Sequence, residues 1–175
     1  GDLYITNKAD DKDIIIRTDD GSGGFTTYMQ FDGSDTRISV AKEFIALDNV
    51  PIRVGSGGDA EFKHDGSNTY LINKVGDFYI QNTADDKDII FQSDNGSGGV
   101  AEYFRLDGSG ADGTSLYTRF PDNSNLTFGS SNDLRLFHNG TDSYIQNHTG
   151  SLNIENYSDD KDIYFKSDDG SGGLT

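Results

Sequence analysis

Three sequence blocks recur in the same order along this chain, and this repetition limits what it can fold into. The first block begins at Gly1, Gly76 and Gly150, at intervals of 75 and 74 residues. The second block reads Asp-Asp-Lys-Asp-Ile and the third reads Gly-Ser-Gly-Gly, each at a constant distance from the first. A unit that recurs whole must bury its apolar face against neighbouring copies or against other chains. The repeat therefore favours a long object built by repetition over a compact enzyme with one unique cleft.

The blocks divide the chain into three predicted units. Residues 1–75 form the first unit, residues 76–149 the second, and residues 150–175 a partial third. The third unit stops at Leu174-Thr175, whereas the second continues through Ala101-Glu102-Tyr103-Phe104. We therefore expect this sequence to be a window of a longer polypeptide.

The composition indicates a thin hydrophobic core. Hydrophobic residues make up 33% of the chain and Gly contributes 22 of its 175 residues, so one chain cannot fill a thick core by itself. The apolar residues nevertheless follow a strict period of two, and many are aromatic or β-branched, which argues against disorder. A core shared between chains, or a slim solenoid closed within one chain, fits both observations.

The net charge restricts the partners of this chain. A formal charge of −16 and a pI near 4.2 exclude a nucleic-acid-binding surface, which needs a basic footprint. Anionic membranes would also repel the chain. Such a charge keeps a long exposed object soluble and prevents side-by-side association. Cysteine is absent, so disulfides cannot stabilise the fold, and no apolar run approaches the ~20 residues of a membrane span.

Alternating apolar residues predict short antiparallel strands throughout. Leu3 and Ile5 begin the pattern in the first block, and the next strand begins at Ile14. The Gly-Ser-Gly-Gly loops reverse the chain, and Asp65-Gly66 and Asn139-Gly140 predict tight hairpins. In the less regular middle of the unit we expect strands at residues 37–40 and 125–128. The positions expected to face inward include Ile14, Ile16, Met29, Phe31, Phe78, Ile80, Ile89, Phe91, Phe104, Leu106, Leu134, Leu136, Ile163 and Phe165.

Acidic clusters at the second block are candidate metal ligands. Closely spaced carboxylates could bind Ca²⁺, and they repel one another when no cation is present. However, neither the EF-hand spacing nor the nonapeptide Ca²⁺ repeat is present, and Asp followed by Gly is explained by turn formation. We therefore expect no cofactor and no metal requirement, with Ca²⁺ as the alternative. The candidates are Asp10, Asp11, Asp13, Asp85, Asp86, Asp88, Asp159, Asp160 and Asp162.

Two histidines, His64 and His138, are a second candidate metal site. Each lies on the apolar face, one residue before a hairpin turn, and they are 74 residues apart. In three parallel chains around an axis, each histidine would contribute to a three-His ring able to bind a metal or anion. The simpler interpretation is a histidine at a turn edge that donates a hydrogen bond to a neighbouring carbonyl.

No pattern in this chain predicts catalysis. Paired carboxylates can hydrolyse glycosides, but catalysis needs one unique cleft and these carboxylates recur in every unit. The Gly-Ser-Gly-Gly loops lack the Lys and the helix of a P-loop. We therefore predict that this segment is not an enzyme.

The second half of the repeat resembles a known family. Residues 129–145, with His138-Asn139-Gly140 and Ser143-Tyr144-Ile145, resemble the His-Asp-Gly-Ser-Asn-Ser-Tyr-Ile repeat of tail-fibre and related structural proteins from tailed bacteriophages, especially those of marine cyanobacteria. Residues 85–108 are similar to a companion block of the same proteins. The resemblance implies a virion fibre, often a parallel homotrimer, with host recognition at a distal tip. It brings no catalytic residues, and the chain departs from the pattern at residues 41–45.

Together, these observations predict an all-β tandem repeat of short antiparallel strands and hairpins. We expect an intertwined parallel homotrimer, with a single-chain β-solenoid as the alternative. The expected function is a shaft segment of a phage tail or virion fibre, located on the virion or outside the cell. Its partners would be identical chains and other fibre segments or virion proteins, with host glycans reached by a tip outside this sequence. The alternatives are a bacterial surface filament or adhesin stalk, and a polysaccharide-binding β-helix of a tailspike.

Overall fold

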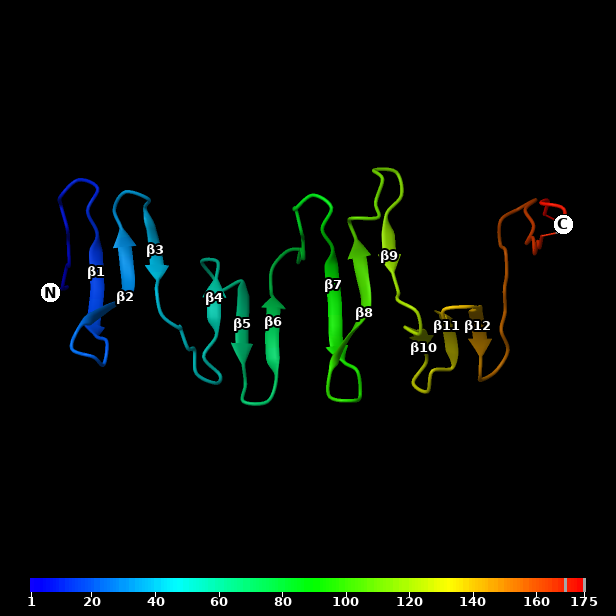
Figure 1. Ribbon diagram of the computed structural model, residues 1–175, viewed down its shortest axis with the longest axis horizontal. Helices are drawn as coiled ribbons and strands as arrows, with labels where there is room; N and C mark the ends of the chain where they lie inside the picture. Colours follow the sequence, from blue (N-terminus) through cyan, green and yellow to red (C-terminus); the bar gives the residue numbers. More distant parts are fainter. Residues whose placement is uncertain (169, 175) are drawn as a thin grey trace. The chain divides into compact units, whose positions relative to one another are not determined.

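The protein consists of short antiparallel strands, as the sequence predicts. A computed structural model describes residues 1–168 and 170–174, and its regular elements are all β-strands (Figure 1). The described residues form no helix, so none of them forms a helical segment that could cross a membrane. The chain divides into two compact units, residues 1–79 and residues 80–175.

Each unit contains two separate three-stranded sheets in which consecutive strands pair. Among the described residues, strands contact only strands of their own sheet. The first unit holds β1 (Ile14–Asp19), β2 (Phe25–Asp32) and β3 (Arg37–Val40) in one sheet, and β4 (Ile52–Val54), β5 (Ala60–His64) and β6 (Thr69–Asn73) in the other. The second unit holds β7 (Ile89–Asp94), β8 (Val100–Asp107) and β9 (Tyr117–Arg119), and then β10 (Leu126–Phe128), β11 (Leu134–His138) and β12 (Ser143–Asn147).

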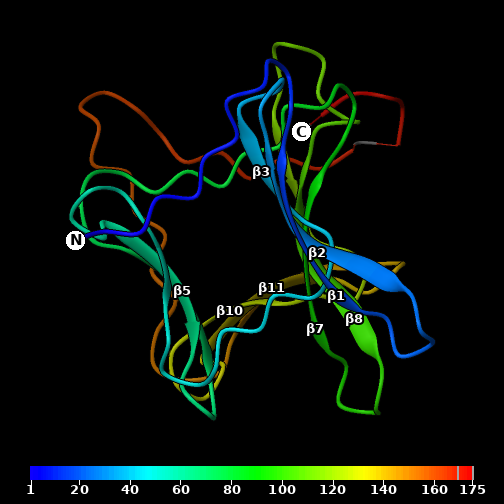
Figure 2. The ribbon, with the colours of Figure 1, turned by 90° about the vertical axis from the view of Figure 1, so that its left-hand side faces the viewer.

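The longest ladders, β1–β2 and β7–β8, carry a β-bulge at corresponding positions. The register shifts between Ile16 and Arg17 in the first ladder and between Phe91 and Gln92 in the second. A bulge inserts one extra residue and increases the local twist. The extra residue is a tyrosine in both cases, Tyr28 in β2 and Tyr103 in β8. Beyond the bulge, β1 and β2 continue as a two-stranded ribbon that β3 does not reach (Figure 2).

The predicted hairpins at Asp65-Gly66 and Asn139-Gly140 are confirmed, and the glycine φ values show which type of turn closes them. Gly66 and Gly140 adopt φ values of +95° and +94°, whereas Asp65 and Asn139 do not have positive φ. A glycine at the first central position is the pattern of a type II′ turn, and positive φ at both central residues would indicate type I′. Each Asp or Asn therefore lies before the turn, and its Oδ1 accepts the next free backbone N–H groups, as for Ser67 and Asn68.

The first-block strands are absent from the structure, which corrects the prediction. Residues 1–6, 76–81 and 150–155 belong to no sheet, and Leu3, Phe78 and Leu152 are exposed. The predicted strand at residues 163–166 also does not form; nearby, one bridge pairs Asp168 with Leu174. The physical reason is that a strand needs a hydrogen-bonded neighbour, and the described chain supplies none to these segments.

Candidate functional site

The last aspartate of the first and of the second acidic cluster joins the start of a strand to a distant turn through hydrogen bonds. Asp13 Oδ1 accepts the Gly33 N–H (3.0 Å), and its Oδ2 accepts the Gln30 side-chain amide (2.8 Å). Asp88 Oδ1 accepts the N–H groups of Gly108 (3.0 Å) and Ser109 (3.2 Å). These contacts connect the beginning of β1 or β7 to the turn that follows β2 or β8. Asp13 and Asp88 therefore have structural partners that the sequence did not reveal.

The preceding residues of each cluster form a turn closed by an asparagine. Asn7 Nδ2 donates to the Asp13 carbonyl (2.9 Å), and the same bond joins Asn82 to Asp88 (3.0 Å) and Asn156 to Asp162 (3.1 Å). Inside the turn, one aspartate of each cluster adopts a left-handed backbone with φ of 52° or 53°. Asp and Asn tolerate this conformation better than most residues. These aspartates are Asp11, Asp86 and Asp160.

The structure does not assemble the candidate metal ligands. Among the described residues, no group of three or more Asp, Glu, His or Cys side chains is placed to hold a metal ion. The three clusters include Asp10, Asp85 and Asp159, which lie at exposed positions of the turns. Asp162 accepts the Tyr164 hydroxyl through Oδ2 (2.9 Å). The independence of the fold from bound cations stays a prediction.

The glycine-rich loops show that a neutral side chain can replace an aspartate at one of these turns. Asp20 Oδ1 accepts the N–H groups of Ser22 (2.8 Å) and Gly24 (3.0 Å). Asn95 Oδ1 accepts the equivalent groups of Ser97 (2.8 Å) and Gly99 (3.1 Å). The Ser22 N–H is the main reason why the pKa of Asp20 lies below its ordinary value. A neutral amide oxygen can therefore accept the bonds that close this turn, while the lowered pKa of Asp20 indicates that the carboxylate accepts them more strongly.

Asp20→Asn is therefore expected to lower the melting temperature at pH 7 only slightly. The amide oxygen can accept the same bonds, as it does at Asn95. Asp20→Ala removes the acceptor and should lower the melting temperature, because the N–H groups of the turn lose their partner. Thermal unfolding followed by circular dichroism compares the three proteins. A large loss for Asp20→Asn would show that the carboxylate charge has a role of its own, such as cation binding.

His64 and His138 lie at the ends of β5 and β11 and bond across the hairpin. The Nδ1 atom of His64 lies 3.1 Å from Thr69 Oγ1, and that of His138 lies 3.1 Å from Ser143 Oγ. The expected turn-edge histidine is present, but its partner is a side-chain hydroxyl and not a backbone carbonyl. Both histidines are exposed. A three-His ring would require other chains and stays untested.

A buried glutamate, which the sequence gave no reason to single out, organises the β4–β5–β6 sheet. Glu61 is only 6% exposed. Its carboxylate lies 2.8 Å from Lys74 Nζ, 3.3 Å from Arg53 Nε and 3.7 Å from Lys63 Nζ. The hydrogen bond from Lys74 is the main reason why the pKa of Glu61 lies below its ordinary value, and Arg53 lowers it further. Three cations thus neutralise one buried carboxylate on the polar face of this sheet.

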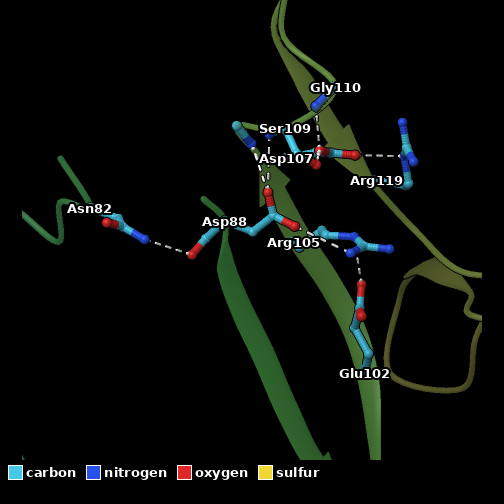
Figure 3. A network of polar contacts seen from close by, with 9 residues as sticks. Asn82, Asp88, Glu102, Arg105, Asp107, Ser109, Gly110 and Arg119 are labelled. Carbon is cyan, nitrogen blue, oxygen red and sulfur yellow. Dashed lines mark hydrogen bonds and ion pairs between the residues drawn. The ribbon is translucent and has the colours of Figure 1, made fainter. Parts of the chain in front are cut away.

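The equivalent polar face of the β7–β8–β9 sheet carries a larger network (Figure 3). Arg105 and Arg119 lie directly opposite each other in the ladder, a like-charge pairing that destabilises a sheet unless it is compensated. Asp88 (3.2 Å) and Glu102 (3.2 Å) contact Arg105, and Asp107 (2.9 Å) contacts Arg119. The carboxylates therefore hold both arginines in place.

Asp107 is the most deeply buried charge of this network. It is 4% exposed and accepts the Ser109 hydroxyl (2.9 Å) and the Gly110 N–H (2.7 Å). These two bonds, followed by the charge of Arg119, hold the pKa of Asp107 below its ordinary value. Asp32 has the corresponding place in the first unit, 3.6 Å from Arg37. The alternation of polar residues predicted this face, but not which charges would meet across the strands.

These lowered pKa values predict that the protein loses stability in acid. A carboxylate with a lowered pKa contributes stability above its unfolded pKa, which is 4.5 for Glu61, and this contribution disappears as the pH falls through the folded pKa. The melting temperature should therefore fall as the pH is lowered below about 4.5. Glu61→Gln should melt lower than wild type at pH 7 but show a weaker pH dependence. Melting curves at several pH values test this.

The control for this experiment is Glu43→Gln, which changes an exposed glutamate with no ion-pair partner among the described residues. It should reproduce the wild-type pH dependence. Equal curves for Glu61→Gln and Glu43→Gln would contradict the assignment of acid sensitivity to the Glu61 cluster.

The opposite face of every sheet is apolar and open. Ile52, Phe62 and Leu71 align across β4, β5 and β6, and corresponding rows cross the other sheets. None of the described large hydrophobic residues is buried. The remaining rows are Ile14, Phe31 and Ile38; Ile89, Leu106 and Thr118; and Leu126, Leu136 and Ile145.

Aromatic rings extend one of these open faces. Phe91 stacks on Phe104 with ring centroids 4.4 Å apart, and Phe104 stacks on Phe120 at 5.7 Å. Phe91 is nevertheless 36% exposed. Each sheet thus has a polar face and an opposite face that presents hydrophobic groups, an arrangement suited to association.

Comparisons with known proteins give no relative for this chain. No protein-family model, no curated protein and no solved structure matches it.

Proposed function

We propose that this chain is a structural shaft segment of a virion fibre, built as a parallel homotrimer. In this role it would hold a distal host-recognition tip away from the particle and would not catalyse a reaction. The observation that carries the proposal is the open apolar face of all four sheets. A fibre of several chains covers these faces with one another and leaves the charged faces in water.

The exposed area supports an association of chains. The chain exposes 14,518 Å², whereas a compact monomer of 19.1 kDa exposes about 8,400 Å². The excess of about 6,000 Å² is several times the ~800 Å² that each partner buries in an interface of standard size. Because apolar burial is the main favourable term in folding, a single chain with no buried hydrophobic residue among those described lacks a substantial part of this term. Folding and assembly are then expected to occur together.

The charge distribution fits the same role. The chain carries a charge of −16, yet the aligned rows on the apolar faces contain no charged residue. Two copies can bring these faces together without bringing carboxylates into contact. The acidic loops and turns stay in water, where their repulsion prevents fibres from bundling. The resemblance of residues 85–108 and 129–145 to phage tail-fibre repeats supports a virion location and a trimer.

Sedimentation of the full chain tests this proposal. We expect a β-rich particle of about three times 19.1 kDa that shows no folded monomer on dilution, because the apolar faces need partners. Sedimentation equilibrium gives the mass, and circular dichroism on the same samples reports the strands. A stable, folded monomer would contradict the proposal and favour a solenoid closed within one chain.

A further inference from the structure

Three segments of the chain have the pattern of strands but no strand beside them. They are residues 1–6, 76–81 and 150–155, called here the unpaired segments. In the second of them Phe78 and Ile80 alternate with Tyr79 and Gln81, which is the period-two pattern of a strand. The described residues provide no backbone hydrogen bonds to Phe78, Tyr79 or Ile80. Tyr79, which is 79% exposed, donates through its hydroxyl to Asp77 Oδ2 (3.4 Å), as residues two apart on an extended backbone can.

Asparagine side chains hold both ends of residues 76–81. Before the segment, Asn73 Nδ2 donates to the carbonyls of Val75 (3.1 Å) and Gly76 (2.7 Å). After it, Asn82 donates to the Asp88 carbonyl (3.0 Å). The third segment has the same arrangement, with Asn147 bonded to the Gly150 carbonyl (2.8 Å) and Asn156 to that of Asp162. Side-chain hydrogen bonds hold both ends of the segment, while the described residues give its middle no backbone partner. The segment is therefore pre-organised for pairing, and it loses little further conformational entropy when it pairs.

The strands β1 and β7 offer open edges for such a segment. Each is hydrogen-bonded on one side only, to β2 or β8. Edge strands are usually protected by charges, prolines or bulges, but β1 begins with Ile14-Ile15-Ile16 and β7 with Ile89-Ile90-Phe91. Their outer N–H and C=O groups are therefore a template for strand addition.

An apolar groove within the second unit lies between Ile80 of the unpaired segment and the apolar face of the β7–β8–β9 sheet. The groove has a volume of about 420 Å³, and Ile80, Ile89, Leu106 and Leu116 are among its lining residues. Although Asn82 places the segment close to the start of β7, the two form no ladder. The groove thus has room for apolar side chains from outside the chain, and an occupant would contact the segment and the sheet together.

The repeat identifies the occupant. The unpaired segments recur at intervals of 75 and 74 residues, so a partner that covers them all must present matching sites at the same spacing. A second copy of this chain has that spacing by construction. Residues 3–6 and 78–81 are also uncharged in a chain of net charge −16, so an equally acidic partner can approach them without strong repulsion.

We infer that the unpaired segments at residues 1–6 and 76–81 add as strands to the open edges of β1 and β7 in a second copy of the chain. The chains of the fibre would then be joined by backbone ladders as well as by apolar contacts. This inference rests on the proposed assembly of identical chains and states how they are joined. It assigns a binding role to Tyr79 and its neighbours, which is exchange of strands between copies.

Cross-linking between labelled chains tests the inference directly. The chain contains no cysteine, so a benzophenone adduct on Tyr79→Cys is the only photoreactive group. Unlabelled and ¹⁵N-labelled full chains are unfolded together, reassembled, irradiated and digested. The expected product joins the residue 79 peptide of one isotope to a peptide containing residues 89–94 or 14–19 of the other. The control is the same adduct on Ser67→Cys at a hairpin tip, which should give no product with these edge peptides.

Hydrogen exchange gives a second measurement on the unmodified chain. The amides of residues 78–81 should exchange at least about tenfold more slowly in the assembled protein than those of residues 83–87 in the following turn. Cross-links within one chain only, cross-links to other regions, or rapid exchange in an assembled trimer would each overturn strand exchange while leaving the proposed fibre intact. A folded monomer in sedimentation would overturn both.

Discussion

Leu136→Asp is expected to prevent the chains from associating. Leu136 lies in the centre of the β10–β11–β12 sheet, directly opposite Leu126 on one side and Ile145 on the other. If this face is covered by other chains, the substitution buries a carboxylate among hydrophobic groups with no cation beside it, and such burial costs several kcal/mol. Sedimentation equilibrium should then show mainly monomer, and circular dichroism should show a loss of strand at concentrations where the wild type is assembled.

The matched control is Thr127→Asp on the opposite face of the same sheet. Thr127 is exposed and lies directly across from Arg135, so the new carboxylate stays in water and gains a favourable neighbour. This variant should assemble like the wild type. If both variants assemble normally, the apolar face is not the interface; if both fail, the added charge alone is responsible.

The difference between these two residues reflects the two faces of each sheet. On the polar faces the buried carboxylates have cationic partners, as Glu61 has in its three cations. The hydrophobic residues of the same sheets are exposed, including Phe62 and Leu71 beside that cluster. The polar faces therefore pair their buried carboxylates within the chain, whereas the apolar faces stay open. Under the proposed assembly, other chains would cover these apolar faces.

The hairpins and several strands, including those in the middle of each repeat unit, could be predicted from the sequence because their signals are local. Asp65-Gly66 and Asn139-Gly140 mark two turns, and the strands expected at residues 37–40 and 125–128 correspond to β3 and β10. The alternation in β2 and β8 needs no knowledge of distant residues. Each of these signals depends on residues a few positions apart, whose geometry a single segment determines.

The features that were not predicted depend on pairing between segments. The bulges at Tyr28 and Tyr103 leave no recognisable mark in the sequence, although they change the alternation relative to the partner strand. The alternation does not indicate the partners of Arg105, but the register places it between Asp88 and Glu102. The first block has the alternation of a strand and forms none in the described chain, because its neighbour is missing. Alternation shows that a segment can form a strand, but it does not identify the strand with which the segment pairs.

Gly108→Ala is expected to lower the free energy of unfolding by about 1–3 kcal/mol, the usual cost of forcing an extra methyl group into a packed site. The backbone of Gly108 does not have positive φ. Glycine is needed there because a neighbouring backbone atom lies close by, and not because of its conformational freedom. A Cβ atom there would lie 2.4 Å from the Lys87 carbonyl oxygen. That oxygen cannot move away easily, because the adjacent Asp88 holds the N–H groups of Gly108 and Ser109.

The same experiment can be repeated at the corresponding position of the first unit. A Cβ at Gly33 would lie 2.5 Å from the Lys12 carbonyl oxygen, so Gly33→Ala should have a similar effect. Gly57→Ala is the control, since its Cβ would meet only the Asp59 carboxylate at 2.8 Å, and that side chain can rotate away. Denaturant unfolding at one fixed protein concentration compares the three variants with the wild type. Equal stability of Gly108→Ala and Gly57→Ala would mean that the turn after β8 does not contact the start of β7, and the role assigned to Asp88 would be wrong.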